Sequence, residues 1–164
     1  MESTLIIPPT NYASFGRRLV ALIIDYIIIG IAQSIIIVPI MGMIGFGAVK
    51  NVENLENMND QQALGLAGAI MGAGMVLNVV GLIAMGIYFT LMHSSEKQAS
   101  IGKMAMGIKV TDMNGNRITR QAAFIRYIGT IVSGAIIFIG YIMAAFTEKK
   151  QALHDMIANT LVLK

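Results

Sequence analysis

The first long apolar run, residues 19–49, constrains the fold more than any other stretch of the sequence. Arg17 and Arg18 stand directly before this run, and Asp25 is the only charged residue inside it. About 20 apolar residues are enough for a helix to cross a bilayer, so the run predicts a membrane span that contains a carboxylate. At about 1.5 Å of rise per residue, Asp25 lies about 10 Å deeper than Arg18 and nearly on the same helix face. A charged residue at this depth costs about 2.5–3.5 kcal/mol, so Asp25 is expected to face protein or water.

The composition places the whole chain in the membrane class. Of the 164 residues, 55% are hydrophobic and 13% are charged, which departs from the composition of a soluble globular protein. Two further apolar runs, 63–92 and 127–147, follow the first. We therefore expect a single membrane domain over residues 1–164 with three transmembrane helices. Cysteine is absent, which excludes disulfides and thiolate metal sites, and no cofactor is expected.

Lysine and arginine are distributed unevenly along the chain. The segment before the first run and the segment 93–126 are basic, whereas the connection 50–62 carries Glu53, Glu56 and Asp60. Because Lys and Arg collect on the cytoplasmic side of membrane proteins, we expect a multi-pass protein of the cell inner (plasma) membrane with its amino terminus in the cytoplasm. This distribution accounts for the net charge of +3 without a nucleic-acid partner.

The third apolar run, 127–147, leaves two topologies open. Three straight crossings are the arrangement we favour, because about 21 residues fit one span well, although they send the lysines that follow to the outside. A re-entrant segment, broken at Ser133-Gly134 or at Gly140, returns the chain end to the cytoplasm instead. In that arrangement Leu161–Leu163 can pair with Ile108–Val110.

Short elements are expected at the membrane surface. Residues 11–19 suit an amphipathic helix whose aromatic rings rest in the headgroup layer. Alternating residues on both sides of Asn114-Gly115 predict a small β-hairpin, since a type I′ turn favours this pair. Residues 148–164 suit an amphipathic helix followed by a short strand. The expected fold class is an all-α membrane protein with three transmembrane helices and these surface elements.

Polar residues within or beside the apolar runs are the candidate site residues. Asp25 either binds a proton or a cation, or it forms a permanent buried ion pair with Arg126 or Arg18. Asp155 either joins the same cluster or belongs to an ordinary amphipathic helix. Asn78 either coordinates an ion through its carbonyl oxygen or makes an interhelical hydrogen bond.

The polar segment after the second run indicates lipid contact rather than catalysis. Lys97, Lys103 and Lys109 are expected to meet anionic headgroups. Residue types found in metal and hydrolase sites occur between His93 and Asp155, but no HxxxH, HExxH or GxSxG spacing accompanies them. Neither a metal site nor an enzyme is expected.

Several separated motifs resemble those of the RDD family of membrane proteins. That family is named for an arginine at the start of its first membrane helix, an aspartate inside that helix and an aspartate near the end of the domain. The corresponding segments here are ASFGRRLVALIID and KKQALHDMIANTLV, which supply Arg18, Asp25 and Asp155. The resemblance covers residues 12–163.

The segment between these motifs resembles the family's central part. In YFTLMHSSEKQASIGKMAMGIKVTDMNGNRI, Gly102-Lys103 and Gly115 stand in the matching places, and Arg126 follows. The chain departs from the pattern at His93, where relatives often have Glu, and at Asn159, where a Gly usually precedes the Thr.

The resemblance implies a role in transport, since some RDD family members are linked to sodium/proton antiport. We therefore expect an ion-coupled transporter of the cation/proton antiport type for Na⁺, K⁺ or H⁺, with Asp25 as the exchanging carboxylate. Arg18, Arg126 and Asp155 are expected to tune this carboxylate. Three helices leave little room for a sealed pathway, so we expect a homo-oligomer or a partner membrane subunit. The alternative is a non-transporting assembly or lipid-binding module, which the GxxxG spacing in the second run and the basic inner face favour.

Overall fold

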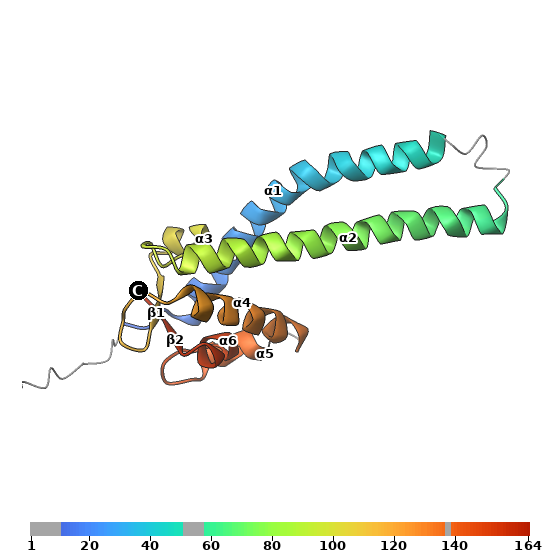
Figure 1. The fold of residues 1–164 in the computed structure, drawn as a ribbon. Coiled ribbons are helices and arrows are strands. Elements are labelled where there is room, and N and C mark those ends of the chain that lie inside the picture. Colours follow the sequence, from blue (N-terminus) through green and yellow to red (C-terminus); the bar gives the residue numbers. More distant parts are fainter. Residues whose placement is uncertain (1–10, 51–57, 137–138) are drawn as a thin grey trace, which may run out of the picture. The chain divides into compact units, whose positions relative to one another are not determined.

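The computed structural model describes residues 11–50, 58–136 and 139–164. These residues are mostly helical and include one two-stranded sheet (Figure 1). They form two compact units, which we call the polar unit (the described part of Met1–Ile27 together with Gly86–Lys164) and the apolar unit (Ile28–Met85). Glu53 and Glu56, on which the predicted acidic connection rests, lie outside the described residues.

The two longest helices, α1 (Phe15–Lys50) and α2 (Asp60–His93), correspond to the first two apolar runs (Figure 1). Both are long and apolar enough to cross a membrane. A helix suits these residues in lipid because it satisfies every backbone polar group within the segment. Large apolar side chains of the apolar unit lie exposed on both helices, as expected for surfaces that face lipid. Examples are Ile35, Ile36, Phe46, Met71 and Val76.

The third apolar run is not one straight helix. It forms α4 (Arg120–Ala135), α5 (Ile139–Ile142) and the short 3₁₀ helix η2 (Met143–Ala145). The axis turns by 115° between α4 and the α5–η2 segment. A Cβ atom on Gly140 would lie only 2.6 Å from Ser133 Oγ, so the missing side chain lets α5 lie directly against α4. Three straight crossings are therefore not confirmed, and the run has the bend of the alternative arrangement.

The sheet joins segments that are far apart in the sequence. Strand β1 (Lys109–Asp112) pairs antiparallel with β2 (Thr160–Leu163), with Val110 opposite Val162. On the other edge of β2, Tyr12 forms a bridge with Leu163. The separate helix predicted for residues 11–19 is therefore wrong, because this segment enters the sheet before α1 begins at Phe15.

The predicted β-hairpin is also wrong, although the chain does turn at Asn114-Gly115. The backbone amides of Asn114 and Asn116 both donate to Asp112 Oδ1 at 2.8 Å. Gly115 has φ +87°, but Asn114 does not have a positive φ, so the type I′ turn that a two-residue hairpin needs does not form. Beyond the turn the chain runs to Thr119, whose hydroxyl caps α4. Strand β1 pairs with β2 instead.

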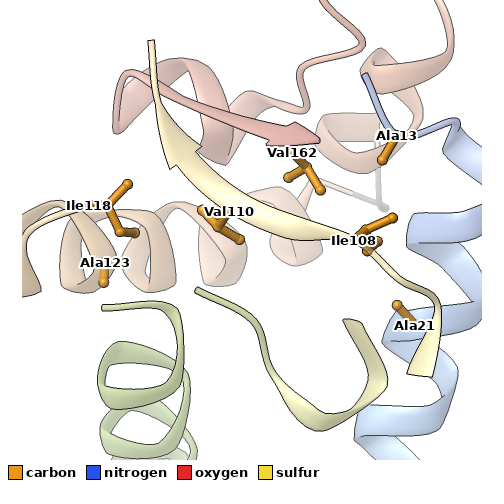
Figure 2. Packing of buried hydrophobic residues seen from close by; sticks show 7 residues of the cluster. All are labelled: Ala13, Ala21, Ile108, Val110, Ile118, Ala123 and Val162. Atoms are coloured by element: carbon orange, nitrogen blue, oxygen red, sulfur yellow. The ribbon is translucent and has the colours of Figure 1, made fainter. Parts of the chain in front are cut away.

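The apolar core of the polar unit lies between the sheet, the start of α1 and the start of α4 (Figure 2). Three of its members are alanines, which bury little apolar area and therefore stabilise the fold only modestly. Polar contacts must therefore supply part of the stability of the polar unit. The core residues are Ala13, Ala21, Ile108, Val110, Ile118, Ala123 and Val162.

Candidate functional site

Asp155 is the centre of a buried group of charges in the polar unit. It lies in the first turn of α6 (Leu153–Ile157), and its Oδ2 accepts a hydrogen bond from the Ala152 amide at 3.1 Å. Arg18 of α1 pairs with the same oxygen, and Arg126 Nη2 of α4 lies 2.5 Å from Oδ1. Asp155 is fully buried and Arg126 nearly so. One carboxylate thus ties α1, α4 and α6 together.

The same two arginines also reach the sheet. Arg126 Nη1 donates to Thr160 Oγ1 in β2 at 2.8 Å, and that hydroxyl donates to the Asp155 carbonyl at 3.3 Å. Arg18 Nε donates to the Ala13 carbonyl at 3.3 Å, beside the segment that bridges to β2. Each guanidinium spreads several donors over a fixed plane, which suits it to join more than one partner.

Electrostatics keep Asp155 ionised and its neighbour His154 neutral. Burial alone would raise the pKa of Asp155, but the Arg126 and Arg18 guanidinium groups hold that pKa well below its usual range. Burial lowers the pKa of His154 to about 3, although the adjacent Asp155 carboxylate opposes this shift. The contact of 3.4 Å between His154 Nε2 and Asp155 Oδ1 is therefore made by a neutral imidazole near pH 7.

Asp25 forms a second buried site in the polar unit. Its Oδ2 accepts from Ser100 Oγ at 2.5 Å, and its Oδ1 accepts from the Gly102 amide at 2.7 Å and from the Tyr88 hydroxyl at 3.4 Å. Only 2% of Asp25 is exposed. The Ser100 and Gly102 donors lie at the start of the short helix α3 (Ile101–Ala105), so Asp25 fixes this segment to α1.

Gly102 makes this approach possible. A Cβ atom at residue 102 would collide with the Ala21 carbonyl oxygen and would lie 2.9 Å from Asp25 Cγ. The Tyr88 hydroxyl in turn accepts from the Ile101 amide at 3.0 Å. The donors around Asp25 are therefore backbone N–H and hydroxyl groups from two neighbouring segments.

These contacts differ from the ion pair considered for Asp25 in the sequence. Among the described residues, the carboxylate that contacts Arg18 and Arg126 is Asp155. Asp25 faces neutral donors instead. A backbone N–H cannot coordinate a cation, whose ligands are oxygen atoms, so a metal ion at Asp25 would have to displace the Gly102 amide from its acceptor. Asn78 lies exposed on α2 in the apolar unit and takes no part in either buried site.

A contact that the sequence did not indicate joins Lys103 to His93. Lys103 Nζ lies 2.7 Å from His93 Nε2 at the end of α2. The His93 ring stacks on Phe89 with 5.5 Å between centroids, and Lys103 Nζ lies 5.9 Å from the Phe89 centroid. Burial, followed by the positive charge of Arg126, lowers the pKa of Lys103 to about 7. In the sequence, Gly102-Lys103 and His93 stood out only against the family pattern, and nothing indicated that Lys103 and His93 meet.

The three lysines expected at lipid headgroups have different environments. Lys97 and Lys109 are exposed, whereas Lys103 is partly buried against His93. Within residues 11–50, 58–136 and 139–164, no group of three or more His, Cys, Asp or Glu side chains is arranged to hold a metal ion.

Comparisons with known proteins agree with the motif resemblance. The RDD family model matches residues 12–159. The chain is 33% identical over 153 residues to "Uncharacterized protein YxaI" of Bacillus subtilis (strain 168), covering 92% of this chain and 96% of that protein. It is 25% identical over 154 residues to "Uncharacterized membrane protein YteJ" of the same organism, covering 93% of this chain and 80% of that protein. No solved structure matches. The extent of the family match and of the first relative shows that the chain belongs to the RDD family.

Proposed function

We propose that this RDD family protein is an anionic-lipid-binding membrane module in which the buried charges are structural. Its apolar helices anchor it, and its basic polar unit rests against the headgroups of the cytoplasmic leaflet. The observation that carries the proposal is the contrast within the polar unit between two buried acids bound by the chain's own donors and many exposed cations. The proposal corresponds to the alternative function considered from the sequence.

The buried acids support a structural role. Asp155 is neutralised by two guanidinium groups, and both oxygens of Asp25 accept hydrogen bonds from α3 and its preceding residue. A cation that displaced these donors from either acid would leave them buried without acceptors. Each donor left in this way costs about 1–3 kcal/mol. The geometry therefore favours fixed attachment over ion exchange at these carboxylates.

The exposed cations support contact with anionic lipid. A lysine or arginine close to an anionic membrane surface contributes about 1 kcal/mol of attraction. In the sequence, Lys50 is the one Lys or Arg outside the two segments that make up the polar unit. Exposed cationic residues of this unit are Lys97, Lys109, Arg117, Arg120, Lys149, Lys150 and Lys164.

The strand pairing supports a topology in which both ends of the chain lie on the same side of the membrane. Tyr12 precedes α1, β1 follows α2, and β2 lies near the carboxyl end, yet β2 pairs with β1 on one edge and forms a bridge with Tyr12 on the other. Such a sheet lies on one side of a bilayer about 30 Å thick, so the chain crosses an even number of times between its pairing segments. We place α1 and α2 as two crossings and the bent α4–α5 segment as a return on the cytoplasmic side. The positive-inside rule gives this side the basic unit.

Thermal unfolding in detergent tests the lipid proposal. Added phosphatidylglycerol should raise the unfolding midpoint of the full chain more than phosphatidylcholine does. The double variant Lys97→Gln/Lys109→Gln should lose a large part of this difference, whereas Glu96→Gln/Glu148→Gln, at exposed acids, should retain it. Equal stabilisation by both lipids, or an unchanged difference in the lysine variant, would refute specific recognition of anionic lipid.

Ion-coupled transport is the second candidate function. The observation that favours it is the presence of several ionisable groups, from α1, α2, α4 and α6, in one buried region of a membrane protein, where such groups are default functional candidates. In this candidate the protein acts as a cation/proton antiporter within an oligomer. Proton flux driven by Na⁺, K⁺ or Li⁺ in proteoliposomes should then exceed that of empty vesicles and fall in Asp25→Asn. Flux equal to that of empty vesicles would exclude this function.

A further inference from the structure

The contact between His93 and Lys103 has an unusual proton requirement. The two facing atoms, Lys103 Nζ and His93 Nε2, are 2.7 Å apart. At this distance one nitrogen must donate and the other must offer a lone pair, because two N–H groups cannot point at each other. The donor is the ammonium or the neutral amine of Lys103 when Nε2 holds the lone pair, and it is the imidazole N–H when the amine holds the lone pair. One N–H therefore lies between the facing nitrogens whether the pair is charged or neutral, and the imidazole accepts from the ammonium in place of a carboxylate.

The surroundings of the pair oppose a further positive charge. His93 is 4% exposed, and the Phe89 ring covers one face of its imidazole. Two guanidinium groups act on Lys103, and the two carboxylates that act on it already accept from other donors. The charged and titratable groups that face the pair are Arg18 and Asp25 of α1, Arg126 of α4, and His154 and Asp155 of α6.

Lys103 differs from the other buried charges in the exposure of the whole residue. Asp25, Arg126 and Asp155 are almost wholly inaccessible, whereas Lys103 is only partly buried. Exchange of a proton at Lys103 therefore requires less opening of the surrounding packing than exchange at those three groups. The low pKa of Lys103, about 7, agrees with exchange in the physiological range.

We infer that His93 and Lys103 form a proton-binding site: in the charged state the Lys103 ammonium donates to the neutral His93 imidazole, and in the neutral state one ammonium proton has passed to the aqueous solution while an N–H···N hydrogen bond remains between Nζ and Nε2. Loss of this proton changes the charge of the buried region by one, beside the segment by which Asp25 holds α3. The site needs no metal or cofactor. It is independent of the proposed lipid binding, and it supplies a proton-carrying group that neither buried aspartate provides.

Nuclear magnetic resonance of the full chain in detergent tests the site directly. With ¹³C-labelled lysine, one Cε signal should titrate with a midpoint near pH 7. The His93 ring ¹⁵N signals should move with the same midpoint, because Nε2 is hydrogen-bonded to the nitrogen that titrates. The titrating lysine signal should vanish in Lys103→Arg, and it should persist in the matched variants Lys97→Arg and Lys109→Arg at exposed lysines.

The wild-type spectra decide the inference even where a variant fails to fold. Lysine signals that all keep their ammonium positions up to pH 9 would overturn it, as would His93 and Lys103 midpoints that differ by more than one pH unit. Neither result depends on vesicles or anionic lipid, so failure of this site is distinguishable from failure of the proposed lipid binding.

Discussion

At the scale of single residues, the two buried aspartates of the polar unit are held in different ways. Asp155 balances two guanidinium groups, one buried and one partly buried, whereas Asp25 accepts hydrogen bonds from neutral donors. Removing one member of a buried ion pair leaves the other charge uncompensated, which costs more than the pair itself contributes. Asp155 is therefore the residue on which the cohesion of the polar unit depends most.

Replacing Asp155 with Asn should destabilise the protein severely. The buried Arg126 and the partly buried Arg18 would lose their counter-charge, and we expect a loss of about 3–5 kcal/mol in the free energy of unfolding. Thermal or chemical unfolding in detergent measures the loss. Glu148→Gln, a matched change at an exposed acid, should stay within about 0.5 kcal/mol of wild type. Similar stability in both variants would contradict the role assigned to Asp155.

Acidification should destabilise the protein already at pH values above those at which carboxylates become protonated. The pKa of His154 is about 3 in the fold and 6.5 in its ordinary state, so between these values the unfolded chain binds more protons. Stability then falls as the pH drops from about 6.5 toward 3, by at most about 1.4 kcal/mol per pH unit for one proton. The lowered pKa of Asp155 adds a further loss below about pH 4. On acidification to pH 4.5 the unfolding midpoint of the wild type should fall toward that of His154→Gln, because the variant lacks the imidazole that must stay neutral in the fold. If the midpoints of both proteins fell in parallel, His154 would not be the cause of the acid sensitivity.

At the scale of elements, α4 and α6 pack closely because α4 has a glycine where they meet. A Cβ atom on Gly129 would lie 2.9 Å from His154 Cβ and 3.0 Å from His154 Cα. The Cα atom belongs to the backbone of α6, which carries Asp155, so a larger residue would push the whole helix away. The close packing and the Asp155 contacts therefore depend on each other.

Gly129→Ala should destabilise the protein by about 1–3 kcal/mol, the usual cost of overpacking. Gly134→Ala provides the control in the same helix, because a Cβ atom there would meet nothing within 4 Å. That control should be neutral or slightly stabilising, since alanine favours a helix more than glycine does. Unfolding midpoints compare the two variants, and equal effects would show that α4 and α6 do not pack closely.

Sequence patterns predicted which helices form better than they predicted which elements pack or pair with one another. Apolar runs predicted α1 and α2, because helix length and lipid exposure are local properties. The pairing of β1 with β2 joins residues about fifty positions apart. The sequence offered this pairing only in the re-entrant arrangement, as Leu161–Leu163 against Ile108–Val110, because alternation around Asn114 favoured a local hairpin. The bend after α4 depends on packing of Gly140 against Ser133, which needs the fold to be known.

The same limit applies to the candidate site. Arg18, Arg126 and Asp155 were candidates because charges beside apolar runs are unusual, but which acid pairs with the arginines depends on the fold. The sequence left open whether Asp155 joins the cluster of Asp25, and in the structure each aspartate has its own set of donors. The roles of Asn78 and of an oligomer stay predictions.

At the scale of the whole molecule, we propose that both ends of the chain lie on one side of the membrane. This topology rests on β2, after α6, which pairs with β1, after α2, and forms a bridge with Tyr12, before α1. It requires the third apolar run to return without crossing, and its 115° bend is compatible with that return. Three straight crossings would separate β1 from β2 by the thickness of the bilayer.

Cysteine labelling in intact cells tests this claim most directly, because the natural chain has no cysteine. Single variants Asn114→Cys, Lys149→Cys and Gln61→Cys each place a thiol at an exposed position. A membrane-impermeant maleimide should label only Gln61→Cys in intact cells, and all three after the membrane is permeabilised. Labelling of Lys149→Cys in intact cells, with Asn114→Cys protected, would show that the third run crosses the membrane and would contradict the account.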